Sequence, residues 1–381
     1  MNILFLSDVY FPRINGVSTS IHTLKGQLVE MGHHVHLVAP DYFSPSEDES
    51  WITRVPAHYL PFDPEDRLMR YGKALDMVAR SLRTDIDLIH VHTPFAAHYM
   101  GLKLAKRYGI PCVETYHTFF EDYMHHYLPV LPRPVLRKVA RTLSRRQCNA
   151  MDAVIAPSQP MLDALRGYGV TVPAEVIPTG LEAHSFVPGD GAGFRARYDI
   201  PAERPMLLFV GRVAHEKNIG FLLRMMVQLK QTRPEALLVI AGEGPALAAL
   251  RAEADVLKLQ DHVCFLGYLD RKTELNDCYR AADVFVFSSL TETQGLVLLE
   301  AMAQGVPVVA IAEMGTKSIL KEGHGALIAP QDEDAFASRV KRLISEPAVR
   351  AEVGRAAAVY AREWSAPTMA RRMVEFYQRM L

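Results

Sequence analysis

Residues 282–311 read ADVFVFSSLTETQGLVLLEAMAQGVPVVAI and predict a strand, a helix and a second strand. The first apolar run ends near Ser288, the helical stretch covers about 295–304, and Gly305 is suited to end the helix before the strand at 306–311. Both runs are apolar at consecutive positions, which is typical of parallel strands covered on both faces. The stretch therefore predicts one strand-helix-strand unit of an open α/β sheet.

The same alternation of short apolar runs and helical patterns occupies most of the chain and falls into two series. The first series contains NILFLS (2–7), HVHLVAP (34–40), DLIHVH (87–92), CVETYH (112–117) and AVIAPS (153–158), and the second contains MLLFVG (206–211), ALLVIAG (236–242), HVCFLG (262–267) and GALIAP (325–330). Two such series predict an α/β protein with two Rossmann-like domains.

The domain boundaries follow from the spacing of these runs. We expect a first domain over 1–180 and a second over 190–362, with the glycine- and proline-rich segment 178–193 as the linker. The tail is helical in pattern but breaks near Ser365–Pro367, because proline disfavours a helical conformation in the residue before it. Residues 366–381 therefore form a separate final helix.

The composition excludes several classes of protein. The chain has 381 residues, of which 49% are apolar and 22% charged, as in globular proteins, and its net charge of −1 gives no reason to expect a nucleic-acid partner. Its four cysteines are widely spaced and form no metal-binding pair, which favours a reducing cytoplasm. We find no leader pattern and no run of roughly 18–20 apolar residues that would span a membrane.

The loop between the strand and the helix of the opening stretch carries the first candidate site. Glu292 lies at the carboxyl end of a strand, where open α/β sheets bind ligands, and Glu300 lies inside the helix. Gly295 permits close backbone approach, and the amides from Leu296 onward favour a phosphate. Carboxylates accept hydrogen bonds from sugar hydroxyls, so a ligand with both groups, such as a nucleotide sugar, fits. The alternative is that both glutamates are solvated surface charges.

Two further loops follow strands and precede helices in the same way. In LLFVGRVAHEKNIGFLL (207–223), Gly211 allows a turn while Arg212 and Lys217 can hold a diphosphate. In DVYFPRINGVSTSIHTL (8–24), Gly16 offers a bare backbone N–H at the start of a helix. Ordinary surface charge and a tight-turn glycine are the alternatives.

These stretches carry a resemblance to a known family. It rests on SLTETQGLVLLEAMAQGVPVVA (289–310), FVGRVAHEKNIGFLL (209–223), YFPRINGVS (10–18) and VIPTGLE (176–182). Together they are similar to the retaining glycosyltransferases of family 4, whose GT-B fold has two Rossmann-like domains facing a central cleft and a C-terminal helix that returns to the first domain. Glu292 and Glu300 match the E-x7-E motif of that family. Thr293-Gln294 stands where many members have an aromatic residue, which leaves the donor sugar open.

The resemblance implies roles for individual residues. Glu300 is expected to bind the ribose, and Glu292 the transferred sugar. Arg212 and Lys217 are expected to stabilise the leaving diphosphate. His117, in ETYHTFFEDY, matches a histidine that contacts the donor sugar and the acceptor. Backbone contacts to the donor are expected at Gly16, Gly211, Gly295 and Leu296.

The resemblance also implies a reaction. A hexose, with UDP-glucose as the favoured donor, is transferred to a hydroxyl with retention, and the leaving phosphate helps to deprotonate the acceptor. GT-B enzymes generally need no metal, and we expect no cofactor. The histidines at 90, 92, 125 and 126 could in principle bind a metal, but alternating histidines on a strand are more often structural.

Residues 133–146 predict a basic amphipathic helix that contains six basic residues and no acidic one. The basic residues are Arg133, Arg137, Lys138, Arg141, Arg145 and Arg146. Such a helix is typical of surfaces that bind anionic lipid, and the preceding HTFFEDYMHHY (117–127) is similar to diacylglycerol glycosyltransferases of bacteria. The alternative is a solvated helix that packs its apolar stripe, Val135, Leu136, Val139 and Leu143, on the first domain.

The sequence therefore favours a glycosyltransferase that acts on a membrane glycerolipid from the inner face of the plasma membrane. A soluble or polysaccharide glycan is the alternative acceptor. A nucleotide-sugar epimerase of the GT-B fold is a second enzyme class, and a binding protein without catalysis is a third hypothesis.

Overall fold

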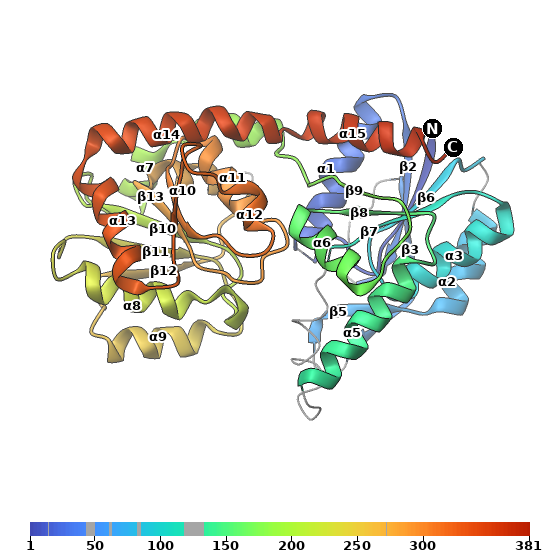
Figure 1. Ribbon diagram of the computed structural model, residues 1–381, viewed down its shortest axis with the longest axis horizontal. Helices are drawn as coiled ribbons and strands as arrows, with labels where there is room; N and C mark the ends of the chain where they lie inside the picture. Colours follow the sequence, from blue (N-terminus) through green and yellow to red (C-terminus); the bar gives the residue numbers. More distant parts are fainter. Residues whose placement is uncertain (14, 43–49, 61–62, 82–84, 118–132, 272) are drawn as a thin grey trace. The chain divides into compact units, whose positions relative to one another are not determined.

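The computed structural model describes residues 1–381 except 14, 43–49, 61–62, 82–84, 118–132 and 272 (Figure 1). The chain divides into two compact units, the first formed by residues 1–180 and 366–381 and the second by residues 181–365. Each unit contains a parallel sheet with helices packed on it, which confirms the prediction of a two-domain Rossmann-like α/β fold.

The first unit is built on a seven-stranded sheet of order β3-β2-β1-β6-β7-β8-β9. Its elements are β1 (Asn2–Leu6), α1 (Gly16–Glu30), β2 (His34–Pro40), β3 (Ile52–Val55), β4 (Ala57–Leu60), β5 (Asp63–Met69), α2 (Tyr71–Ser81), β6 (Leu88–Val91), α3 (Ala96–Tyr108), β7 (Cys112–Thr115), α5 (Arg133–Cys148), β8 (Ala153–Ala156), α6 (Gln159–Tyr168), β9 (Ala174–Val176) and α15 (Ala366–Gln378). Strands β4 and β5 form a separate antiparallel hairpin.

The second unit is built on a six-stranded parallel sheet of order β12-β11-β10-β13-β14-β15. Its elements are η1 (Ala183–Phe186), α7 (Gly191–Arg197), β10 (Met206–Val210), η2 (His215–Lys217), α8 (Ile219–Leu229), β11 (Leu237–Ala241), α9 (Leu247–Val256), β12 (Val263–Gly267), α10 (Leu275–Ala281), β13 (Val284–Phe287), α11 (Leu296–Ala303), β14 (Val308–Ile311), α12 (Thr316–Ile319), β15 (Ala326–Ala329), α13 (Glu333–Ser345), α14 (Pro347–Ala361) and η3 (Arg362–Trp364).

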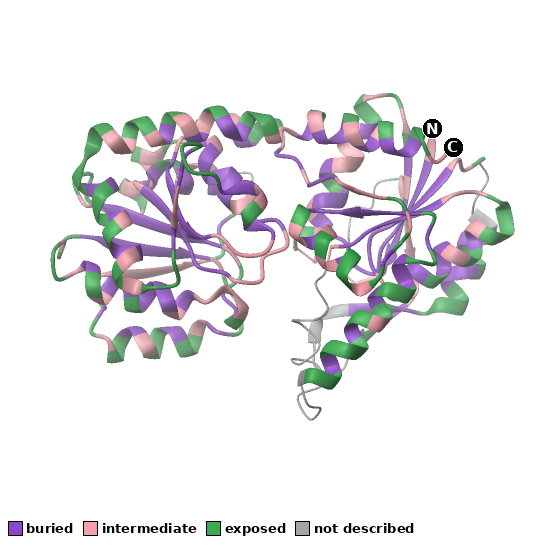
Figure 2. Ribbon diagram, viewed as in Figure 1, coloured by how far each residue is buried: buried purple, intermediate pink, exposed green. Residues whose placement is uncertain are grey.

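Burial explains why the apolar runs form central strands. All residues of β10, β11, β13 and β14 are buried, as expected for strands covered on both faces (Figure 2). Helix α11 ends at Ala303 with Gln304 as its C-cap, and Gly305 follows with a φ of 73°, in the left-handed region that favours glycine. The strand-helix-strand unit predicted from residues 282–311 is therefore confirmed.

The strand order fixes where loops meet. In the second sheet the order reverses between β10 and β13, which pair in parallel, so the loops after these two strands leave the same edge side by side. In the first sheet the reversal lies between β1 and β6. Ligands of open α/β sheets bind at such reversal points, outside the carboxyl ends of the strands.

The expected linker over 178–193 is wrong for most of its length. From Leu181 onward the segment belongs to the second unit, and Leu181 and Phe194 are part of its core. A Cβ on Gly189 would lie 2.4 Å from the carbonyl oxygen of Asn276, so this glycine permits close packing on the start of α10. Gly189, and Gly191 beside the Arg280 carbonyl oxygen, are therefore packing positions rather than parts of a linker.

The C-terminal helix follows the sequence prediction. Helix α14 gives way to η3, Ser365 has an extended conformation, and α15 begins at Ala366. Helix α15 belongs to the first unit, where it lies against α1 (Figure 1). Its Met373, Phe376 and Tyr377 are part of the first unit's core.

Candidate active site

Two loops of the second unit meet through an ion pair. Lys217 ends the loop after β10 and Glu292 lies in the loop after β13, and Lys217 Nζ is 2.5 Å from Glu292 Oε2. The two side chains are 17% and 20% exposed, so the pair is accessible from solvent. Sequence reasoning placed both residues at this edge, but it did not predict that they contact each other.

Hydrogen bonds to the backbone hold the same two loops together. Asn218 Nδ2 donates to the Ser288 carbonyl oxygen at 3.2 Å, and Ser288 Oγ donates to the Asn218 carbonyl oxygen at 2.9 Å. Asn218 precedes α8 with a φ of 54°, and its side chain makes no capping bond to that helix. Its side chain therefore fastens one loop to the other.

Arg212 is exposed directly after β10 and Gly211. A Cβ on Gly242 would lie 1.9 Å from the Gly211 carbonyl oxygen, so the loops after β10 and β11 are in close backbone contact. The Val213 amide donates to the Glu243 carbonyl oxygen at 2.8 Å across the same contact. These contacts with the loop after β11 hold the backbone on both sides of Arg212.

Glu300 lies in α11 and is almost completely buried, with a side chain 6% exposed. Its Oε2 accepts a hydrogen bond from the Tyr279 hydroxyl at 2.7 Å, and its Oε1 accepts one from Arg271. The adjacent Glu300 carboxylate raises the pKa of Arg271, while burial and that carboxylate raise the pKa of Tyr279 well above its usual value. A carboxylate has about four acceptor positions, so it can still accept bonds from ligand hydroxyls.

Gly295 adopts a left-handed conformation, with φ 93° and ψ 49°, immediately before α11. A Cβ there would lie 3.0 Å from Leu298 Cδ1, and Gly295, as the N-cap residue, has no side chain with which to cap the amides from Leu296 onward. The Glu292 carbonyl oxygen accepts a bond from the Gly315 amide at 2.8 Å. This contact with the loop after β14 holds the Glu292 loop, although the aromatic residue common in the family is missing.

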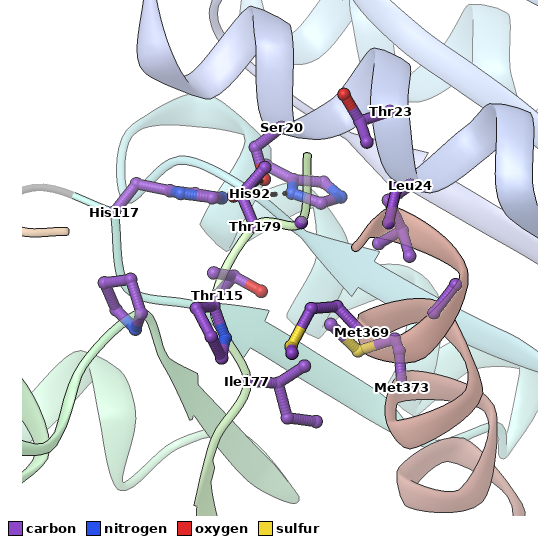
Figure 3. Close-up of a pocket in the computed structure, with 15 residues that line it drawn as sticks. Ser20, Thr23, Leu24, His92, Thr115, His117, Ile177, Thr179, Met369 and Met373 are labelled. Atoms are coloured by element: carbon purple, nitrogen blue, oxygen red, sulfur yellow. Dashed lines mark hydrogen bonds between the residues drawn. The ribbon is translucent and has the colours of Figure 1, made fainter. Parts of the chain in front are cut away.

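In the first unit, His117 lies two residues beyond the end of β7 and is partly buried. Its Nε2 is 3.3 Å from Nδ1 of the buried His92, and burial lowers the pKa of His117 to about 4 (Figure 3). The ring is therefore neutral at physiological pH and can donate or accept a hydrogen bond. Residues 118–132, including His125 and His126, lie outside the described part of the chain.

Gly16 begins α1, which Asn15 caps by accepting the Ser18 amide at 2.8 Å. A Cβ on Gly16 would meet no atom within 4 Å, and its φ is not in the left-handed region. No left-handed turn therefore requires this glycine, and among the described residues the space on its Cβ side is open.

Asp8, which the sequence did not single out, lies after β1 and is buried. It accepts the Thr93 hydroxyl at 2.8 Å and the Ala97 amide at 3.1 Å, at the start of α3. Burial raises the pKa of Asp8 to about 6. Its contacts are with the protein itself, so Asp8 fastens the loop after β6 to the loop after β1.

The basic helix predicted at 133–146 is α5, and its packing differs from the solvated-helix alternative. Leu136 and Ala140 are buried, whereas Val135 and Val139 are 48% and 47% exposed. Leu143 is 37% exposed. The stripe of Val135, Val139 and Leu143 therefore faces away from the first unit's core, and only Leu136 packs as the solvated-helix alternative expected.

The basic residues of α5 lie in two different environments. The Arg141 guanidinium is 5.5 Å from the centre of the Tyr168 ring, and the aliphatic stem of Arg145 lies over Gly169, so both contact the end of α6. Arg137, Lys138 and Arg146 are also exposed, and the side chain of Arg133 lies outside the described residues.

The described residues contain no helix that is both long and apolar enough to span a membrane. Within the same ranges, no group of three or more histidine, cysteine, aspartate or glutamate side chains is arranged to hold a metal ion. His90 is instead bonded at both ring nitrogens, to the Tyr377 hydroxyl at 2.6 Å and to Thr115 Oγ1 at 2.7 Å.

Comparison with known proteins gives the same picture for both units. The model described as Glycosyltransferase Family 4 matches residues 14–185, and the model described as Glycosyl transferases group 1 matches residues 192–360. The alpha-monoglucosyldiacylglycerol synthase of Streptococcus pneumoniae is 33% identical over 99% of this chain and 85% of its own length. The enzyme of the same name from Acholeplasma laidlawii is 28% identical over 90% of this chain and 87% of its own length.

A solved structure supports the fold assignment. Sucrose-phosphate synthase from Thermosynechococcus elongatus aligns over 100% of this chain and 99% of its own, with a TM-score of 0.83 and 23% identity. Together with the matched family models and the relative at 33% identity, this agreement identifies the class of the protein. The chain belongs to the family 4 glycosyltransferases of the GT-B fold.

Proposed function

We propose that this enzyme transfers glucose from UDP-glucose to a hydroxyl group of a membrane glycerolipid, with retention of the anomeric configuration. The observation that carries the proposal is the arrangement at one sheet edge of the second unit, where Glu292 and Lys217 are paired and the Glu300 carboxylate is held by Arg271 and Tyr279. The names of the two diacylglycerol relatives support glucose as the sugar and a lipid as the acceptor.

In this proposal the carboxylates of Glu300 and Glu292 bind different parts of the donor. Glu300 accepts hydrogen bonds from the ribose hydroxyls. Arg271 and Tyr279 hold its carboxylate in one orientation, and each carboxylate oxygen keeps a further acceptor position for the ligand. Glu292 accepts bonds from the glucose hydroxyls after Lys217 turns from it to the diphosphate. The amides after Gly295 and the amide at Gly16 contact donor oxygens. The Gly211 amide donates to the Ala241 carbonyl oxygen at 3.1 Å, so Gly211 contributes space for the donor rather than a hydrogen bond.

The cations supply the main electrostatic contribution. Negative charge grows on the leaving diphosphate as the glycosidic bond breaks, and preorganised positive groups at that position lower the barrier. Arg212 and Lys217 take this part, and no metal ion is needed in the scheme. EDTA should accordingly leave turnover unchanged, while a loss of turnover that added magnesium restores would contradict this assignment.

Retention is consistent with the alpha linkage in the names of the two relatives, since UDP-glucose itself has the alpha configuration. The acceptor attacks from the face that the diphosphate leaves, and a phosphate oxygen takes the acceptor proton. His117 is neutral, because burial lowers its pKa to about 4, and it holds a sugar hydroxyl by a hydrogen bond.

Helix α5 provides the docking surface for the lipid acceptor. Its exposed face combines Val135 and Val139 with the basic residues Lys138 and Arg146. Apolar side chains that enter the interface and cations that contact anionic headgroups are the two features of a membrane-surface helix. We therefore place the enzyme as a peripheral protein on the inner face of the plasma membrane, on a leaflet that contains anionic lipid.

A donor screen tests the proposal. Purified protein is incubated with UDP-glucose, UDP-galactose or GDP-mannose, with and without vesicles of diacylglycerol and anionic phospholipid, and released UDP or GDP is measured. We expect UDP release from UDP-glucose that increases with vesicles. Release that needs only a soluble glycan would identify the other acceptor class, and interconversion of the nucleotide sugar without an acceptor would identify an epimerase.

A further inference from the structure

Three histidines of the first unit lie in a row but do not have equivalent surroundings. His90 and His92 are at the end of β6, and their ring centres are 4.0 Å apart, while the ring of His117 stacks beyond His92 with a centre distance of 5.6 Å. Burial lowers the pKa of all three, so each ring carries one proton at neutral pH. The position of that proton on each ring is set by hydrogen bonds.

His90 is fully satisfied by the protein, because both of its ring nitrogens have partners. His92 differs from it. His92 is 1% exposed, its Nδ1 is bonded to His117 Nε2, and its Nε2 has no hydrogen-bond partner among the described residues. A buried polar atom without a partner costs about 1–3 kcal/mol, which is a reason to look for what it faces.

His92 lines a cavity of about 30 Å³ in the first unit (Figure 3). Ser20, Thr23 and Thr179 line the same cavity, together with residues that have apolar side chains, such as Leu24 and Met369. A cavity above roughly 10–15 Å³ can hold a water molecule where polar partners are present. The cavity therefore has the size and the lining for a water that bonds to His92 Nε2.

The hydroxyl groups give this site a direction. Thr179 Oγ1 donates to Ser20 Oγ at 2.7 Å, so the Ser20 proton is directed elsewhere and can be donated into the cavity. A water that accepts this proton can in turn donate to a bare His92 Nε2. The opposite arrangement would direct two donors, the Ser20 hydroxyl and a His92 Nε2–H, into one small and largely apolar cavity.

We propose that His92 is a positioning residue that fixes the tautomer of His117, through a chain that runs from Thr179 and Ser20 by way of a water in this cavity. With Nε2 accepting, the proton of His92 lies on Nδ1 and is donated to His117 Nε2. The proton of His117 then lies on its Nδ1, where it is available to a sugar hydroxyl. This inference rests on the proposed function for the substrate contact of His117, but not for the tautomer itself.

The tautomers are measured directly by nitrogen-15 NMR of the histidine rings in the full-length protein, with His117 assigned from a His117→Gln variant. In the unsubstituted protein we expect a protonated Nδ1 and a bare Nε2 on both His92 and His117. A His117 ring with its proton on Nε2 would overturn the proposal. This measurement uses the unsubstituted protein, so it does not depend on whether a His92 variant folds.

Substitutions at position 92 separate a positioning role from a structural one. His92→Phe keeps the ring but removes both nitrogens, so the His117 signals should shift toward the Nε2–H form and kcat should fall roughly tenfold, with the donor KM unchanged. His92→Asn should restore both the His117 signals and kcat, because the amide nitrogen of asparagine lies near the position of the His92 Nδ1. The control is His36→Phe, at a histidine of β2 whose ring is bonded to Thr53 of β3. This variant should change neither the His117 signals nor kcat.

The outcomes distinguish the positioning role of His92 from the substrate contact of His117. Unchanged His117 signals in His92→Phe would refute the positioning role. Shifted signals with an unchanged kcat would support the positioning role and refute the substrate contact proposed for His117. Failure of His92→Asn to restore the His117 signals would also refute the proposed hydrogen-bond chain, because that chain requires a donor at the position of the His92 Nδ1.

Discussion

Lys217 and Glu292 contact each other at 2.5 Å across the reversal point of the second sheet, although each is expected to contact a different part of the donor. In the protein without ligand, each charge therefore neutralises the other. In the proposed reaction, donor binding replaces this pair by a contact of Lys217 with the diphosphate and of Glu292 with the sugar. Under that proposal the pair couples recognition of the sugar to stabilisation of the leaving group.

The first prediction concerns the cation of this pair. Lys217→Ala should lower kcat about 10²–10³-fold, because it removes a preorganised positive charge from the leaving diphosphate. Lys341→Ala, at an exposed lysine of α13 in the same unit, is the matched control and should retain normal turnover. Normal turnover of Lys217→Ala, measured by released UDP, would show that this lysine does not stabilise the diphosphate. Arg212→Ala should behave like Lys217→Ala.

The second prediction uses the ion pair to separate the two glutamates. Glu292→Gln should lower kcat but bind UDP roughly fivefold more tightly, because about 1 kcal/mol of competition for Lys217 is removed. Glu300→Gln should instead weaken UDP binding, because the ribose contact is made in both the ground state and the transition state. Calorimetric titration with UDP and steady-state kinetics give both values. Weaker UDP binding in Glu292→Gln would contradict the assignment of Lys217 to the diphosphate.

The sequence predicted these positions because they lie in local patterns. Apolar runs gave the central strands, and the rule that ligands bind at the carboxyl ends of strands placed Arg212, Lys217 and Glu292 at one edge. Arg271 was missed because its bond to Glu300 joins the loop before α10 to helix α11, and no local pattern marks such a contact. The hairpin of β4 and β5 was also missed, since its strands, AHYL and DPEDRLM, are too polar for an apolar-run criterion.

Other errors came from tertiary packing. Gly189 and Gly191 read as parts of a flexible linker, yet their missing side chains make room for the backbone of α10. The alternating histidines at 90 and 92 read alike in the sequence, and only the structure separates the satisfied ring from the one that faces a cavity.

A third prediction concerns acid stability of the first unit. His90, His92 and His117 have lowered pKa values in the folded protein, so the stability they contribute is present above about pH 6.5 and is lost as the pH falls. For His117 this loss extends through its folded pKa of about 4. Asp8 acts in the opposite direction, because its pKa is raised to about 6: its contribution is present below about pH 4 and is lost as the pH rises through 6. With three groups against one, we expect net destabilisation on acidification.

This pH dependence is measured with one tryptophan as the reporter. The chain contains two, Trp51 in the first unit and Trp364 in the second, so Trp364→Phe leaves a signal from the first unit alone. Thermal unfolding followed at Trp51 should show a midpoint that falls from pH 7 to pH 4, and more steeply when Asp8→Asn is added. A midpoint that rises on acidification would contradict the assignment of neutral buried histidines.

A fourth prediction concerns the exposed face of α5. Replacing Lys138 and Arg146 by serine should weaken binding to anionic vesicles roughly thirtyfold, since each basic residue near such a surface contributes about 1 kcal/mol. The matched control replaces Lys341 and Arg342 of α13, which removes the same charge from the second unit. Co-sedimentation at low salt measures the binding, and UDP affinity should stay normal in both variants. Equal vesicle binding by the two double variants would show that α5 is not the docking surface.

The central claim is retaining transfer of glucose to a lipid hydroxyl, and the anomeric configuration of the lipid product tests it most directly. The enzyme is incubated with UDP-glucose and diacylglycerol vesicles, the lipid is extracted, and proton NMR gives the coupling of the anomeric proton. We predict a glucosyl lipid with the small coupling of an alpha linkage. A glucosyl lipid with the large coupling of a beta linkage would contradict the account. So would an extract without glucosyl lipid if UDP is released while glucose is transferred to a soluble acceptor.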